Sequence, residues 1–82
     1  MAAEDTVRML REAIAVSPEN VPLRRALGEA LLSMGRYEEA EGELKRAVAL
    51  APGDSGTKLA LAGAYYVQEK NSQAMVIVED LL

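Results

Sequence analysis

The chain has 82 residues, enough for one small domain, and its 13 acidic and 9 basic residues give a net charge of −4. This acidic balance argues against a nucleic-acid partner, which would require a basic stripe. Because the chain has no Cys and no His, it cannot form disulfides, thiolate nucleophiles or Cys-based metal sites, and it lacks the commonest general base.

The apolar residues make up half of the chain and are mainly Ala, Leu and Val, with three Tyr and no Phe or Trp. Small aliphatic side chains suit close packing between helices better than a sheet, so we expect an all-α fold. No apolar run approaches the length of a membrane span, and the N-terminus lacks a basic stretch followed by an apolar one. We therefore expect a cytoplasmic protein with no secretory signal and no membrane partner.

The first predicted helix covers residues 5–16 and ends before Pro18, which cannot donate the next backbone hydrogen bond. The second begins after Asn20, a favourable N-cap, and carries Leu and Ala three or four residues apart. It ends at Gly35, because glycine most readily adopts the left-handed conformation that closes a helix.

The third predicted helix covers residues 38–50 and ends before Pro52. Its acidic residues come first and its basic residues later, which is the order that complements the helix dipole. Glu41 and Lys45 also form a favourable pair one turn apart.

The fourth predicted helix covers residues 56–68 behind a cap at Asp54 or Ser55. The fifth runs from a cap at Asn71 or Ser72 to the end of the sequence. A β-branched run lies within the fifth segment, but a strand there would have no partner strand, so we expect a helix.

The sequence repeats weakly with a period of 34 residues. The coinciding positions are small residues, helix stops and caps: Leu10 with Leu44, Ala13 with Ala47, Pro18 with Pro52, Asn20 with Asp54, Ala26-Leu27 with Ala60-Leu61, Ala30 with Ala64, and Ala40 with Ala74. A period of this length that contains two helices is typical of one class of helical repeat.

Residues 21–54 resemble one complete tetratricopeptide repeat (TPR). The matching positions are the Leu-Gly pair, the turn residues, the small and large residues of the second helix and the closing proline: Leu27-Gly28, Gly35, Tyr37, Ala40, Leu44, Ala47 and Pro52. Small side chains let two antiparallel helices approach closely, while large ones fill the neighbouring groove.

The other segments are similar to parts of a repeat. Residues 1–20 resemble a second helix alone, and residues 55–82 resemble a partial repeat that departs from the pattern at Glu69, Asn71 and Leu81. The resemblance implies a single domain with about five helices, in which antiparallel helix pairs stack as a short right-handed solenoid. It also implies a non-catalytic module for protein–protein interaction or assembly.

Two short stretches of the sequence resemble a catalytic motif and a cation-binding site. Residues 53–56 read Gly-Asp-Ser-Gly, as around the nucleophile of trypsin-like proteases, but the chain has no His to accept the serine proton. We therefore interpret them as a turn with a helix cap. The four glutamates within residues 38–43 suggest a cation site, but helical spacing points them in several directions, so we expect a solvated face. We expect no enzyme activity, metal or cofactor.

Family members usually bind peptides on the concave side of the array, lined by the first helix of each repeat. The resemblance carries this role to eight candidate positions: Arg25, Glu29, Leu32, Ser33, Leu59, Gly63, Tyr66 and Val67. Ala60 and Glu29 stand where a chaperone-binding subgroup has asparagines, so that carboxylate clamp is not supported. Leu59 and Tyr66 are either peptide anchors in the groove or core residues packed against the fifth helix or a neighbouring molecule.

The last helix is apolar almost all round, which suggests that another surface covers it. The candidate self-association residues are Met75, Val76, Ile77, Val78, Leu81 and Leu82. The expected partner is a protein or peptide, together with a second copy in a dimer or a downstream domain. An alternative is that the chain is a self-association or regulatory arm of a larger multidomain protein. Residues 13–32 and 64–82 are loosely similar to the region before the motor domain in some bacterial AAA-type ATPases.

Overall fold

The computed structural model describes residues 2–82, and within them it has five α-helices and no strand. The helices are α1 (Ala3–Val16), α2 (Val21–Ser33), α3 (Tyr37–Leu50), α4 (Ser55–Val67) and α5 (Asn71–Leu81). The predicted all-α fold is confirmed, and the β-branched run near the end lies within α5.

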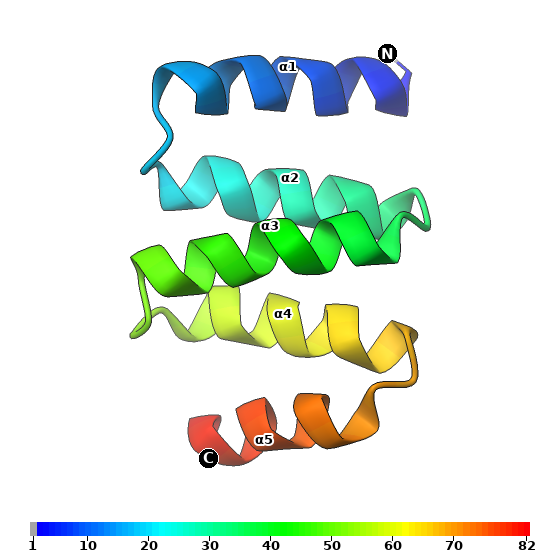
Figure 1. Ribbon diagram of the computed structural model, residues 1–82, viewed down its shortest axis with the longest axis vertical. Coiled ribbons are helices and arrows are strands. Elements are labelled where there is room, and N and C mark those ends of the chain that lie inside the picture. Colours follow the sequence, from blue (N-terminus) through cyan, green and yellow to red (C-terminus); the bar gives the residue numbers. More distant parts are fainter. Residues whose placement is uncertain (1) are drawn as a thin grey trace.

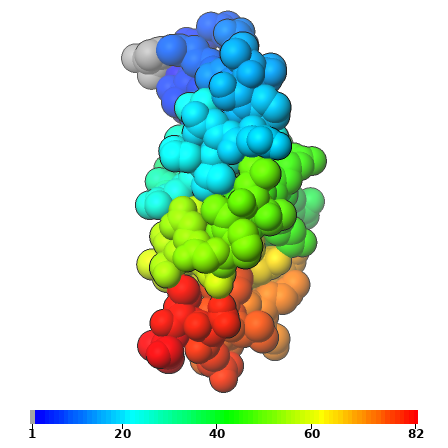
Figure 2. Space-filling model, turned by 90° about the vertical axis from the view of Figure 1, so that its left-hand side faces the viewer, coloured from blue at the N-terminus to red at the C-terminus, as the bar shows by residue number. Residues whose placement is uncertain are grey.

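The helices lie roughly antiparallel and stack one after another from α1 to α5 (Figure 1). Consecutive helices contact each other, and α2 also contacts α4. The resulting body measures 35 × 24 × 15 Å, and its colours follow the sequence along the long axis (Figure 2). Each helix is therefore supported mainly by its neighbours in the sequence, as in repeat proteins.

The 34-residue period is a structural repeat. The bounds of α1 and α3 differ by this offset, as do those of α2 and α4. The two connecting turns also match, because Ser17 and Ala51 have φ and ψ angles of −130° and 73° and of −139° and 73°. As predicted, Asn20 and Asp54 cap the helices that follow, with side-chain oxygens that accept backbone hydrogen bonds of 3.1 Å.

The turns inside the two helix pairs share a Schellman motif. After α2, Gly35 has a φ of 77°, and the Arg36 amide donates to the Leu31 carbonyl over 2.9 Å. After α4, Glu69 has a φ of 62°, and the Lys70 amide donates to the Tyr65 carbonyl over 2.9 Å. The unusual residue at position 69 therefore preserves the turn, but with a side chain in a conformation that favours glycine.

The predicted cap of α5 is wrong. Lys70 occupies the N-cap position without a side-chain hydrogen bond to the backbone, and Asn71 is already the first helical residue. The tight turn at Glu69 sets this boundary, because α5 begins immediately after it.

Two connected clusters form the core. The first joins α1, α2 and the start of α3 through Val7, Ile14, Leu27, Leu31 and Ala40. The second joins α3, α4 and α5 through Leu44, Leu61, Ala64, Tyr65 and Ala74. Leu32, a candidate groove residue, is half-buried and packs against both clusters, so it also links the two parts of the stack.

Helices α2 and α3 pack tightly against each other at Gly28. A β-carbon at this position would lie 2.6 Å from Cγ of Leu44, which is fully buried. In the α4–α5 pair, the equivalent positions hold Ala62 and Val78. The larger residue on the first helix is therefore matched by a smaller one on the second.

The acidic cluster of α3 is not a uniformly solvated face, and that prediction is wrong for Glu43. Its side chain is only 8% exposed and pairs with Arg46 at 2.8 Å, Arg24 at 3.2 Å and Arg11 at 3.6 Å. A carboxylate at this depth is stabilised only when charged partners surround it, so Glu43 ties α1, α2 and α3 together.

Glu41 makes the corresponding link to the C-terminal part. Its carboxylate accepts hydrogen bonds from Lys70 at 2.8 Å and from Gln68 at 2.9 Å. Lys45 completes the predicted pair one turn along α3, at 2.9 Å. These bonds, with that from Lys70 foremost, lower the pKa of Glu41 to about 2.

Candidate protein-interaction surface

The candidate groove consists of equivalent positions from two repeats. Arg25, Glu29, Leu32 and Ser33 lie on α2, and Leu59, Gly63, Tyr66 and Val67 follow 34 residues later on α4. We call this row of eight residues the inner row.

The α2 half of the inner row is polar and internally paired. The Arg25 guanidinium binds the Glu29 carboxylate at 2.8 Å, and the Ser33 hydroxyl donates to the Glu29 carbonyl at 3.1 Å. The hydrogen bond to Glu29 raises the pKa of Arg25. Arg25 also reaches toward α4, because a β-carbon on Gly56 would lie 2.5 Å from its Nη1 atom.

The α4 half is apolar and open. Leu59 is 59% exposed, Tyr66 is 69% exposed and Val67 is 45% exposed. Leu59 and Tyr66 are therefore exposed in this chain and are not buried in its core, and their role as peptide anchors stays a prediction. Three large apolar side chains on one exposed helix face are the type of surface that supplies anchor residues for a partner.

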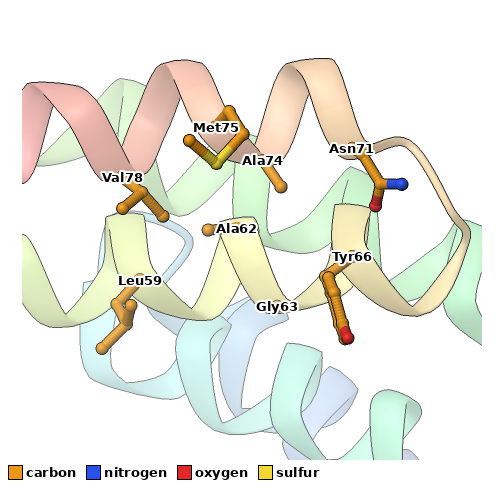
Figure 3. Close-up of a pocket in the computed structure, with 8 residues that line it drawn as sticks. All are labelled: Leu59, Ala62, Gly63, Tyr66, Asn71, Ala74, Met75 and Val78. Carbon is orange, nitrogen blue, oxygen red and sulfur yellow. The ribbon is translucent and has the colours of Figure 1, made fainter.

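A groove of about 550 Å³ runs between α4 and α5 beside this half. Its lining residues are Leu59, Ala62, Gly63, Tyr66, Asn71, Ala74, Met75 and Val78 (Figure 3). Leu59 and Tyr66 mark its two ends along α4, the small residues Ala62 and Gly63 lie between them, and Val78 points toward Ala62 from α5. We call this the α4–α5 groove.

The sequence did not predict Ala62, Asn71 and Ala74 as members of this surface. Ala62 and Ala74 occupy small-residue positions of the repeat pattern, where their expected role is helix packing. They also line the α4–α5 groove, because nothing among residues 2–82 stacks on this side of α4 and α5. In the sequence, only the 34-residue offset relates these positions to their equivalents in α2 and α3, where the next helix of the stack covers them.

The candidate self-association residues do not form one face. Met75 and Val78 line the α4–α5 groove, whereas Val76 and Ile77 line a separate groove with Val48, Lys58 and Leu61. Met75 is 53% exposed, Val76 is 67% exposed and Leu82 is almost fully exposed, while Leu81 is half-buried. Two sides of α5 are thus open.

The Gly-Asp-Ser-Gly stretch is a turn and a helix cap, as predicted. Asp54 accepts a hydrogen bond from the Thr57 hydroxyl at 2.8 Å and one from the Gly56 amide at 3.1 Å. These bonds, led by that from Thr57, lower the pKa of Asp54. Among residues 2–82, no three potential metal ligands come together, and no helix has the length and apolar character needed to cross a membrane.

Comparison with known proteins identifies the fold family. The sequence pattern of the tetratricopeptide repeat matches residues 2–55 and again residues 35–82. The chain belongs to the tetratricopeptide repeat family. Proteins of this family generally act as interaction scaffolds, and the domain is a protein–protein interaction module of this type.

Solved structures support the same assignment. The chain is 27% identical to those described as "MamA D159K mutant 2" and "MamA AMB-1 P212121", with TM-scores of 0.87 and 0.88. Each match covers 94% of this chain but only 42% of the other, so the TPR chain spans less than half the length of these proteins. No curated protein matches it, and neither the family match nor these two structures support the looser resemblance to AAA-type ATPases.

Proposed function

We propose that this TPR domain binds a protein or peptide segment along the inner row, with α4 as the main contact. The carrying observation is the exposure of Leu59, Tyr66 and Val67 on one face of α4. The polar residues of α2 then orient the segment, because Arg25 and Glu29 present charges at its other end. Apolar anchors provide affinity and charged groups provide register.

In this proposal the domain acts without chemistry of its own. Binding needs no enzyme activity and no cofactor. The functional unit is a single domain made of a half repeat in residues 1–20, a full repeat in residues 21–54 and a partial repeat in residues 55–82. The matching turns before α2 and α4 support this division.

A random peptide library displayed on phage tests the inner row. We expect selection on the wild-type chain to enrich peptides whose binding falls about tenfold in Leu59→Ala and Tyr66→Ala, since truncating an anchor costs on the order of 1–2 kcal/mol. Val16→Ala is the control, because Val16 is 84% exposed on α1, a helix that does not contact α4. Enriched peptides that bind both α4 variants at full strength would contradict the proposal.

A second candidate function is self-association through α5, or contact between α5 and another domain. It is favoured by the exposure of Met75 and Val76 on two sides of one helix. Size-exclusion chromatography with light scattering would detect a dimer, and Val76→Asp would dissociate it if this side is buried between copies. A monomer at all concentrations would rule out the dimer.

A further inference from the structure

We propose that the α4–α5 groove is a docking site for an amphipathic α-helix of a partner protein, and that the partner's groove-facing stripe is uncharged. This inference rests on the proposed function and specifies the class of partner. It follows from the internal repeat, because the same groove occurs one repeat earlier and is filled there.

The filled groove lies between α2 and α3, and its occupant is α4. Leu44 of α3 is fully buried in one cluster with Leu61, Ala64 and Tyr65 of α4. Leu32 of α2 packs against the same cluster. A helix with alternating small and large side chains therefore fits this groove.

The α4–α5 groove repeats these positions 34 residues later. Tyr66 stands where Leu32 stands on α2, and Val78 stands where Leu44 stands on α3. The backbone continues the same stack, because α4 has the bounds of α2 shifted by one repeat and α5 begins one repeat after α3. The open groove therefore presents the surface on which the next helix of such a stack would pack.

The two grooves differ in charge. Glu41, at the edge of the filled groove, accepts hydrogen bonds from Gln68, which caps the end of α4, and from Lys70, which lies beyond the turn that follows α4. The equivalent position in the open groove is Met75, and no charged residue is among those that line this groove. A glutamine or lysine just beyond the incoming helix, like Gln68 and Lys70, would find no carboxylate there, so the groove selects an uncharged, apolar stripe.

Synthetic helices test this inference directly. The parent peptide is the α4 segment, residues 54–70, carrying a fluorophore, and the second peptide carries Gln68→Met and Lys70→Ala. We expect the wild-type chain to bind the second peptide several-fold more tightly in fluorescence anisotropy. Met75→Glu should reverse this order, because it restores the acceptor that Gln68 and Lys70 use in the filled groove.

Two further variants locate the bound peptide. Tyr66→Asp should weaken binding about tenfold, since it places a charge at the position that packs on the neighbouring helix in the filled groove. Val76→Asp, on the other side of α5, should leave binding unchanged. Circular dichroism checks that the variants remain helical, and the reversal by Met75→Glu is a gain that unfolding would not produce.

The outcomes distinguish a failure of this inference from a failure of the proposed function. Absence of saturable binding by both peptides, or equal binding to wild type and Tyr66→Asp, would overturn the inference. A chain that dimerises through Met75 and Val78 would also overturn it, because the occupant would be a second copy. If phage-selected peptides still depend on Leu59 and Val67 while neither synthetic helix binds, the inference fails and the proposed function stands. If no displayed peptide depends on α4, the proposed function fails.

Discussion

The α2–α3 pair and the α4–α5 pair have the same backbone plan but different surroundings. The first pair is covered by α1 on one side and by α4 on the other, whereas the second is covered on one side, where α2 and α3 contact α4 (Figure 1). Several residues are buried in both pairs, such as Leu31 and its counterpart Tyr65, but others that the first pair buries have half-buried counterparts, such as Leu44 and Val78. Position within the stack, together with the repeat pattern, therefore decides which apolar residues are core and which are available to a partner.

The two pairs also show how one fold tolerates different residues at its contacts. Gly28 with Leu44 and Ala62 with Val78 occupy equivalent places, and the exchange of size between them keeps the helices close. In the turn after α4, Glu69 stands where the turn after α2 has glycine. The turn keeps the same shape, but Glu69 must adopt a left-handed backbone conformation that is unfavourable for a residue with a side chain.

The largest contrast is expected from truncating the equivalent residues Leu44 and Val78. Leu44→Ala should lower the free energy of unfolding by about 2–5 kcal/mol, because the side chain is fully buried. Val78→Ala should lower it by roughly 1 kcal/mol, because the smaller side chain is half-exposed. Urea denaturation measures both, and similar losses would mean that something covers α5 in solution.

The second-largest change in stability is expected at the tight contact between Gly28 and Leu44. Gly28→Ala should destabilise the fold by about 1–3 kcal/mol, since the new methyl group meets Leu44. Adding Leu44→Val, which copies the outer pair, should recover part of the loss. Gly42→Ala is the matched control: no atom lies within 4 Å of the added carbon, so this helix should gain about 0.5–1 kcal/mol. If the double variant is no more stable than the less stable of the two single variants, the residue sizes at these two positions do not compensate for each other.

The carboxylate of Glu41 makes the link between the pairs dependent on pH. Its pKa in the folded chain is about 2, below the ordinary value of 4.5, so folding favours the charged form. The stabilisation, on the order of 2 kcal/mol, is present above pH 4.5 and is lost as the pH falls toward 2. Glu41→Gln should flatten this part of the pH profile of unfolding, while the exposed Glu38→Gln should not. Identical profiles for both variants would count against the link.

The smallest effect concerns the two Schellman turns. Glu69→Gly should stabilise the chain by about 0.5–1 kcal/mol, because it removes a side chain from the left-handed conformation. Gly35→Ala should destabilise it by about 1 kcal/mol for the same reason. Thermal unfolding of the two variants should move in opposite directions, and a loss of stability in Glu69→Gly would show that its side chain has another role.

Much of the fold was predictable because its signals are local. Proline, glycine and capping residues fixed three of the four helix connections to within a few residues, and the 34-residue offset related the two repeats. The start of α5 was missed because a left-handed glutamate ended the previous turn without the usual glycine. The burial of Glu43 was missed because its three arginines come from three different helices.

The candidate surface was only partly predictable. The inner row follows from the repeat register, but whether Leu59 and Tyr66 are core or surface depends on which helix stacks on α4. The α4–α5 groove joins residues from two helices and became evident only from their packing.

Hydrogen exchange measured residue by residue tests the central claim that the second pair is an unfilled copy of the first. Amides of α5 should exchange faster than those of α3 in the free chain, because α5 is covered on fewer sides. Addition of the residue 54–70 peptide with Gln68→Met and Lys70→Ala should slow exchange in α5 and leave α1 unchanged. Equal protection of α3 and α5 in the free chain, or a peptide that slows no amide of α5, would contradict the account.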